Sequence, residues 1–299
     1  MRVGGDKIFC MNGKLIALLA VCLLAACQRT PETRPAAQKD VAVAAPEEEQ
    51  DLEKALTRAV FGNAALVNGR EVLGFKDLGH GKAALVISEI PQGSPEPGMR
   101  DMALQATISA FLLDKVDGKW TVTRRHESIA DMGSNGNAGE LTWVTLGAGK
   151  PGFAIVDESG NRGQSVKSLA LFDLTAKDMR ALAGKPVLVH SDNDGDCEGE
   201  RPHCWNISGE WRLVQNQGQA YADLEIAFSG VVEQRSEEAK QKADALTDAA
   251  GAEPSYDEYL AALGPRDQRK VKSTARYALS EKGIRLASGE NPAETSDGE

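Results

Sequence analysis

The sequence has no apolar stretch long enough to cross a membrane as a helix. Its most apolar segment, Leu15 to Leu24, has about ten residues, whereas a helix needs roughly 20 to span the hydrocarbon layer. This segment alone would therefore be a poor permanent anchor. Whatever holds the protein at a membrane is expected to act by another means.

Basic residues are scarce relative to acidic ones. Lysine and arginine number 34 against 44 aspartates and glutamates, which gives a formal net charge of −10. No stretch gathers the basic residues into the stripe that phosphate backbones require. Nucleic acid is therefore not an expected partner, and the acidity is interpreted as favouring solubility.

Common hydrolase motifs are also missing. The chain contains no G-x-S-x-G, H-E-x-x-H or S-x-x-K sequence, and His126-Glu127 lacks its second histidine. The segment Gly147–Lys150 is only superficially similar to a phosphate-binding loop, because Pro151 stands where serine or threonine would contact magnesium. No catalytic residue is predicted. Surface or turn positions explain the histidines, which are His80, His126, His190 and His203.

The first 26 residues have the features of a signal peptide. A short cationic start containing Lys14 leads into the apolar stretch, which ends in the small residues Ala25 and Ala26. The residues Leu24-Ala25-Ala26-Cys27 resemble the lipobox of bacterial lipoproteins, in which the cysteine becomes the first mature residue. This resemblance covers only the first thirty or so residues. An ordinary signal peptide with a chance cysteine is the alternative.

The resemblance to Gram-negative lipoproteins implies that Cys27 carries acyl chains, palmitate among them, and is the membrane anchor. One acyl chain binds a membrane marginally, whereas several bind it stably. In this family the residue after the cysteine directs sorting, and an Asp there favours the inner membrane. Gln28 therefore favours the outer membrane, on its periplasmic or surface side. Met11 is a more usual translation start than Met1, and both remain open.

Four parts are predicted along the chain. They are a signal peptide over 1–26, a lipidated cysteine and tether over 27–48, one β-rich domain over 49–288, and a disordered acidic tail over 289–299. The tether is rich in Pro, Ala, Glu and Gln without an apolar period, as in flexible linkers. A polar helical insertion is expected over about 233–265.

Alternating apolar and polar residues predict a mainly β domain, an antiparallel sandwich or barrel with a few short helices. Tight hairpins are predicted at Asp117-Gly118 and Gln217-Gly218, and a last hairpin at Glu281–Gly283. Further strands are predicted near Glu71–Phe75, Ala83–Ile90, Leu141–Leu146, Gly152–Val156, Val166–Leu174 and Pro186–His190.

Two helices are predicted from local signals. Glu49 to Val60 has apolar residues at spacings of three and four on one face. Ser255 and Glu258 form a capping-box pattern before an apolar run that stops at Gly264-Pro265.

Only two cysteines remain after Cys27. Cys197 and Cys204 should pair in an oxidising compartment, closing a short loop. The competing interpretation is a zinc site made by both cysteines with His203 and His190, although the usual C-x₂-C spacing is missing.

The most specific chemical signal in the sequence is an acidic segment that begins at Asp192. Asp192, Asp194, Asp196 and Glu198 alternate along the chain and could supply the hard oxygens that Ca²⁺ prefers. The EF-hand template fails, because Cys197 replaces its glycine and position twelve is a histidine. A calcium loop of another kind is one interpretation, and a solvated Asp/Asn/Gly turn is the other.

Two further features suggest binding. The loop Asp131–Gly139 is dense in residues that tolerate positive φ, and such loops often bind ligands, although plain connection is the commoner explanation. Trp205 and Trp211 share a strand face, where they could stack on a sugar or simply fill the core.

The predicted function is that of a membrane-anchored envelope lipoprotein whose domain binds an envelope protein, a glycan or calcium, without catalysis. The alternative is a periplasmic hydrolase without a recognisable motif. A deep pocket that joins a histidine to a carboxylate would favour the hydrolase.

Overall fold

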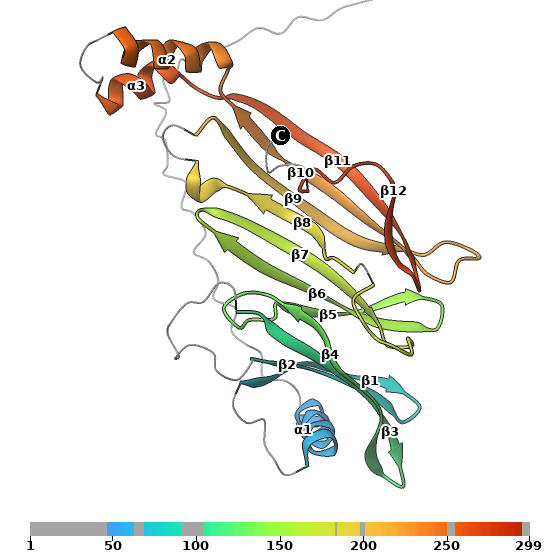
Figure 1. Ribbon diagram of the computed structural model, residues 1–299. Helices are drawn as coiled ribbons and strands as arrows, with labels where there is room; N and C mark the ends of the chain where they lie inside the picture. Colours follow the sequence, from blue (N-terminus) through green and yellow to red (C-terminus); the bar gives the residue numbers. More distant parts are fainter. Residues whose placement is uncertain are drawn as a thin grey trace, which may run out of the picture. The chain divides into compact units, whose positions relative to one another are not determined.

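The alternating residues form two antiparallel sheets, as the mainly β prediction requires (Figure 1). The structure, a computed structural model, describes residues 47–62, 69–90, 104–182, 184–197, 201–249 and 255–294. The predicted signal peptide, lipobox and most of the tether lie outside these ranges, as does Glu198. None of the described helices is long and apolar enough to span a bilayer.

The smaller sheet has four strands in the order β1-β2-β3-β4. The strands are β1 (Arg70–Gly79), β2 (Lys82–Glu89), β3 (Ala106–Val116) and β4 (Lys119–Met132). The predicted hairpin turn joins β3 to β4, with positive φ at both Asp117 and Gly118. Helix α1 (Glu47–Phe61) buries Leu56 and Val60 against Leu85 and Phe111 of this sheet. The helix therefore covers one face of the smaller sheet.

The larger sheet has eight strands in the order β12-β11-β10-β9-β8-β7-β6-β5. Its strands are β5 (Glu140–Gly147), β6 (Lys150–Asn161), β7 (Gln164–Asp173), β8 (Val187–Asp192), β9 (His203–Val214), β10 (Asp223–Gln234), β11 (Asp267–Ser280) and β12 (Gly283–Ser288). The described β5 and β12 remain sheet edges, so of the two predicted forms the structure has the sandwich and not the closed barrel.

The two sheets pack face to face through β6 and β7. Phe153 and Phe172 stack with ring centroids 4.7 Å apart and belong to one buried cluster with Val86 and Ile108 of the smaller sheet. The opposite face of β7 contributes Leu171 to a second cluster with β8 to β11. Because β6 and β7 are buried on both faces, they form the centre of the domain.

The predicted helical insertion joins β10 to β11. Helix α2 (Glu237–Ala249) and helix α3 (Tyr256–Leu263) lie beyond the ends of these strands (Figure 1). The capping box is present, because the Ser255 hydroxyl accepts the Glu258 N–H and the Glu258 carboxylate accepts the Ser255 N–H.

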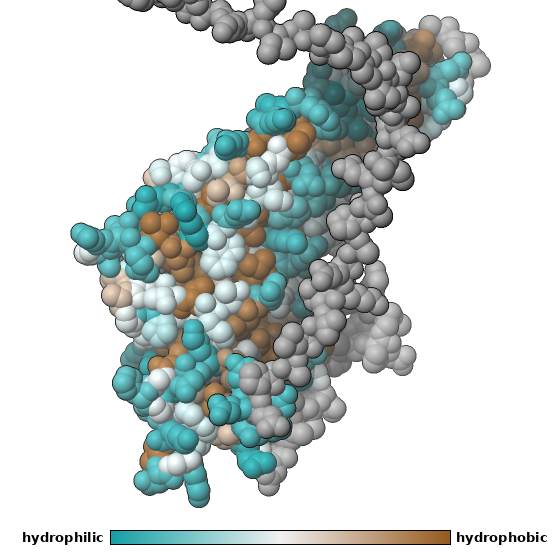
Figure 2. Space-filling model, turned by 180° about the vertical axis from the view of Figure 1, so that it is seen from behind, coloured by the Kyte–Doolittle hydropathy of each residue, from teal (hydrophilic) through white to brown (hydrophobic). Residues whose placement is uncertain are grey.

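The outer surface mixes polar and apolar residues. On the side opposite to Figure 1, hydrophilic residues surround scattered apolar ones (Figure 2). The large apolar side chains that are exposed among the described residues are Val116, Leu246, Tyr256 and Leu286.

The start of the predicted disordered tail is packed into the domain, which corrects that prediction for its first residues. Asn291 and Ala293 are buried, and the Asn291 amide donates to the Leu188 carbonyl and the Tyr277 hydroxyl, both at 2.9 Å. The polar composition predicted that these residues would be exposed to solvent. The Asn291 amide is buried instead, and these hydrogen bonds satisfy it. Residues 295–299 lie outside the described ranges.

Candidate functional site

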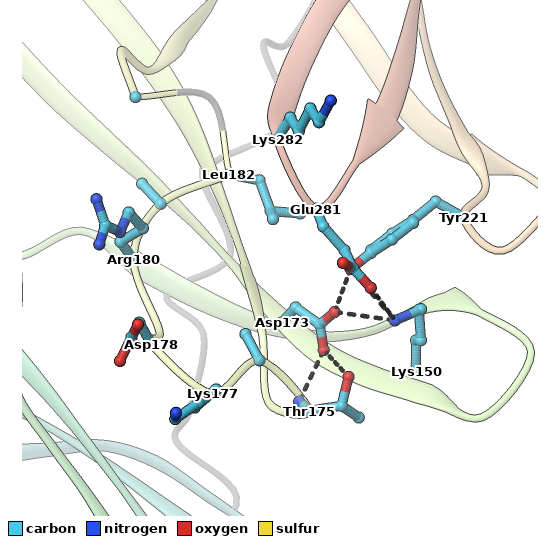
Figure 3. Close-up of a pocket in the computed structure, with 13 residues that line it drawn as sticks. Lys150, Asp173, Thr175, Lys177, Asp178, Arg180, Leu182, Tyr221, Glu281 and Lys282 are labelled. Carbon is cyan, nitrogen blue, oxygen red and sulfur yellow. Dashed lines mark hydrogen bonds and ion pairs between the residues drawn. The ribbon is translucent and has the colours of Figure 1, made fainter.

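A cavity of about 720 Å³ opens between the loop after β7 and the β11–β12 turn (Figure 3). Gly283 allows these walls to approach, because it has a φ of +131° and a Cβ there would lie 2.7 Å from the Leu182 carbonyl. Leu182 in turn donates its N–H to the Leu171 carbonyl of β7 at 2.8 Å. The loop and the turn are thus held against the larger sheet.

Asp173, the last residue of β7, is the centre of a polar network at the cavity floor. Its Oδ2 accepts the Tyr221 hydroxyl at 2.6 Å and lies 3.6 Å from Lys150 Nζ. Lys150 also donates to the Tyr221 hydroxyl at 3.2 Å. Asp173 Oδ1 accepts the Thr175 N–H at 2.7 Å and its hydroxyl at 2.6 Å. Both carboxylate oxygens of Asp173 are therefore satisfied (Figure 3).

The turn before Lys150 brings that residue to Tyr221. Gly147 packs directly on the chain before β10, since a Cβ there would lie 2.1 Å from the Ala220 carbonyl. Ala222 donates its N–H to the Leu146 carbonyl at 2.7 Å, which fixes the same contact. The segment Gly147–Lys150, whose similarity to a phosphate-binding loop is superficial, thus has another role, which is to place Lys150 in the cavity.

The network keeps Lys150 and Asp173 charged. Burial opposes ionisation of Asp173, whose side chain is 1% exposed, but hydrogen bonds from Thr175 and Tyr221 and the charge of Lys150 hold its pKa below the ordinary value. Burial likewise opposes the charge of Lys150, yet the Tyr221 hydrogen bond and Asp173 raise its pKa. Burial and the bond to Asp173 raise the pKa of Tyr221.

These shifts argue against a nucleophilic lysine. An amine that attacks a carbonyl needs a lowered pKa so that it is neutral, whereas Lys150 is held as a cation. The arrangement suits an ammonium that binds a polar or anionic group.

Three cations stand at the rim of this cavity. Lys177, Arg180 and Lys282 are exposed, and none forms an ion pair with another residue that the structure describes. The rim carboxylates are Asp178 and Glu281, the latter 4.0 Å from Lys150 Nζ. The charges of Lys150 and Asp173 cancel, and the three rim cations outnumber the two rim carboxylates. The cavity therefore carries a net positive charge, although the protein as a whole is acidic.

Sequence reasoning missed this site. Asp173 and Tyr221 are 48 positions apart, and Lys150 lies in a segment without a recognisable functional motif. The available signal was a carboxylate inside the apolar run Val166–Leu174, since a buried Asp needs partners.

The acidic segment is held by protein contacts. Asp192 Oδ2 lies 2.6 Å from His190 Nε2, Asp194 accepts from the Asn206 amide at 2.5 Å, and Asp196 pairs with Arg201. The buried Asn193 braces the segment by accepting the Trp205 N–H at 2.8 Å. The described residues contain no cluster of three His, Cys, Asp or Glu side chains suited to a metal.

Cys197 and Cys204 form the predicted disulfide, with Cα atoms 5.7 Å apart. Both sulfurs are used in this bond, so neither is a thiolate ligand for the zinc site considered as the alternative. Trp205 is buried and donates its indole N–H to Ser191 at 2.8 Å, which favours the core role over the stacking platform with Trp211.

A second polar arrangement lies on β8 and β9. Ser208 Oγ is 2.8 Å from His190 Nδ1, and His190 Nε2 contacts Asp192. These are the residue types of a serine-hydrolase triad, but the ring nitrogens are exchanged relative to it, because there the serine faces Nε2.

The loop 131–139 has the backbone that its composition predicts. Gly133, Asn135, Gly136 and Gly139 all have positive φ. The loop lies on β6, where the Ser134 hydroxyl donates to the Glu158 carbonyl at 3.0 Å.

Comparisons of this chain with models of protein families, with curated proteins and with solved structures find no match.

Proposed function

We propose that this chain is a lipid-anchored envelope protein whose β-rich domain binds an anionic ligand in the Lys150 cavity without chemically changing it. The anchor rests on the lipobox at Cys27, and Gln28 supports the outer membrane as the destination. The tether that follows would let the domain stand off the membrane surface.

One observation carries the binding proposal, namely a cavity in which the half-buried Lys150 pairs with the buried Asp173, while the rim cations form no ion pair with a described residue. A carboxylate or phosphate group entering the cavity would meet Lys150, Arg180 and Lys282 and form charge-assisted hydrogen bonds. An acidic envelope glycan or a phosphate-bearing sugar has this chemistry. The mixed polar lining supports recognition of such a ligand over a purely apolar one.

The test uses the full chain purified in detergent and titration calorimetry. The probes are oligogalacturonate and glucose 1-phosphate, with an uncharged galacto-oligosaccharide as control. At least one charged probe should bind, more weakly as salt increases. The double variant Arg180→Ala, Lys282→Ala should weaken binding about tenfold, because each lost charge removes a charge-assisted contact.

The matched control is Lys270→Ala, an exposed lysine of β11 that does not line the cavity. It should bind as the unchanged protein does. Failure of both charged probes, or equal binding of the uncharged one, would contradict the proposal.

Hydrolysis is a second candidate, favoured only by the hydrogen-bonded chain Ser208–His190–Asp192. This chain lies within the sheet, where β8 pairs with β7 and β9, and β9 pairs also with β10. Backbone N–H groups used in a sheet ladder are not free to stabilise an oxyanion. Binding is therefore the better supported function.

A further inference from the structure

Two arginines stand at the base of the helical insertion formed by α2 and α3. Arg235 lies just before α2, and Arg266 lies just after α3. The Arg235 guanidinium donates through Nη1 to the carbonyl of Gly264, the residue that caps the end of α3. The start of the insertion is therefore tied to its end.

The same two arginines bind the loop that the disulfide closes. Arg266 donates from Nη2 to the Cys197 carbonyl at 2.6 Å and from Nε to the Arg201 carbonyl at 3.1 Å. Arg235 donates from Nε to the Arg201 carbonyl at 3.4 Å, and its backbone N–H donates to the Pro202 carbonyl at 2.8 Å. Carbonyl groups of one short loop thus accept hydrogen bonds from both ends of the insertion.

The two guanidinium groups depend on these carbonyl groups. Burial and the nearby charge of Arg266 lower the pKa of Arg235, and the Arg266 side chain is only 15% exposed. Glu233 lies 3.9 Å from Arg266 Nη1 and offsets part of the positive charge. A partly buried guanidinium has five N–H donors, and leaving them without acceptors is costly. Displacement of the loop would therefore destabilise the base of the insertion.

The disulfide is the covalent link that holds the loop in place. Cys204 is buried on β9, opposite Glu233 of β10, and its bond to Cys197 fixes the other end of the loop next to the sheet. The ion pair between Asp196 and Arg201 also crosses the loop, but both side chains are partly exposed, so it contributes little. Cys197 is itself partly exposed, which makes its sulfur the accessible one of the pair.

We propose that the Cys197–Cys204 disulfide is a redox switch that controls the mobility of the helical insertion. In the oxidised protein, the loop carbonyl groups hold Arg235 and Arg266, and these arginines hold α2 and α3. Reduction removes the covalent closure of the loop and with it the fixed position of these acceptors. This inference does not depend on the proposed anion-binding cavity.

A dithiol reductant opens the switch by thiol–disulfide exchange. One thiolate of the reductant attacks Cys197 Sγ, the S–S bond breaks, and Cys204 leaves as a thiolate that takes up a proton. The second thiol of the reductant then displaces Cys197. Two electrons have passed to the protein, which now has two thiols, and the reductant has become a disulfide.

The experiment is hydrogen exchange with mass spectrometry on the full chain in detergent, with and without dithiothreitol, which is a dithiol. Peptides from α2 and α3 should exchange about tenfold faster after reduction, because local opening of the insertion becomes easier. The double variant Cys197→Ser, Cys204→Ser should show the fast exchange without reductant and should not respond to it.

Arg266→Gln tests the link between the loop and the insertion, and it leaves the disulfide intact. It should accelerate exchange in α2 and α3 about tenfold, and reduction should then add little. The matched control is Arg212→Gln, which changes an exposed arginine of β9 that pairs with Glu225. It should leave exchange in α2 and α3 unchanged.

Leu56→Ala is the control for a general loss of stability, because it removes a buried side chain of α1. It should leave exchange in α2 and α3 as it is in the unchanged protein. The inference is overturned if oxidised and reduced protein exchange alike in α2 and α3, or if Leu56→Ala accelerates these helices as much as reduction does.

Discussion

The Tyr221 hydroxyl donates a 2.6 Å hydrogen bond to Oδ2 of Asp173, and this bond links the chain before β10 to the end of β7. The same carboxylate oxygen faces the ammonium of Lys150. The floor of the main cavity is therefore a structural element as well as the feature that makes the cavity suitable for an anion. Removing one of its charges should measurably change the free energy of unfolding of the domain.

Stability should fall at both ends of the pH range because of this network. The folded state lowers the pKa of Asp173, so its contribution is present above the unfolded pKa and is lost as pH falls below about 4. The folded state raises the pKa values of Lys150 and Tyr221, so their contributions are lost as pH rises beyond about 10. Urea unfolding at each pH measures both effects.

Asp173→Asn should lower the free energy of unfolding by about 2 kcal/mol at pH 7, because it removes the buried charged partner of Lys150 and leaves only the exposed Glu281 carboxylate near it. It should also flatten the acid limb of the pH profile. A control is Asp114→Asn on the smaller sheet, whose ion pair with Lys82 is solvent-exposed and should contribute less than about 1 kcal/mol. Equal effects of the two substitutions would contradict this role for Asp173.

The disulfide should stabilise the domain modestly. Cys197 and Cys204 are separated by seven positions, and closing so short a loop contributes about 2.5 kcal/mol in the chain-entropy model. Cys204→Ser should therefore lower the free energy of unfolding by about this amount. Reduction with dithiothreitol should destabilise the unchanged protein but not the variant, and a response of both to the reductant would argue against the disulfide as its target.

The membrane anchor should depend on a single residue. Cys27→Ser should remove labelling by radioactive palmitate and release the protein from the membrane fraction, since stable anchoring needs several acyl chains. Gln28→Asp should keep the label but move the protein to the inner membrane, as the resemblance to lipoproteins implies. Retention of palmitate by Cys27→Ser would rule out lipidation at this position.

The Ser208–His190–Asp192 chain should be inert towards serine-hydrolase reagents, because the backbone around it is committed to sheet pairing. A fluorophosphonate probe should label the native protein no more than a heat-denatured sample. If labelling occurs and Ser208→Ala removes it, the hydrolase alternative replaces the binding function.

Local patterns in the sequence determined most of the secondary structure. Side chains alternate across a strand with a period of two, so each strand can be predicted from its own residues, and Asp117-Gly118 specifies a tight turn without help from distant contacts. The same holds for the capping box at Ser255 and Glu258 and for the positive φ values at Gly133 and Gly139.

Only the tertiary structure decided which polar residues meet. Asp192, Asp194 and Asp196 stand out in the sequence, yet His190, Asn206 and Arg201 contact them, whereas Asp157 is inconspicuous and retains an oxygen without a described partner. The cavity at Lys150 likewise requires β7, the β5–β6 turn and the chain before β10 to converge. Strand pairing and burial bring these segments together. The residues next to each segment in the sequence do not indicate which distant segment it will contact.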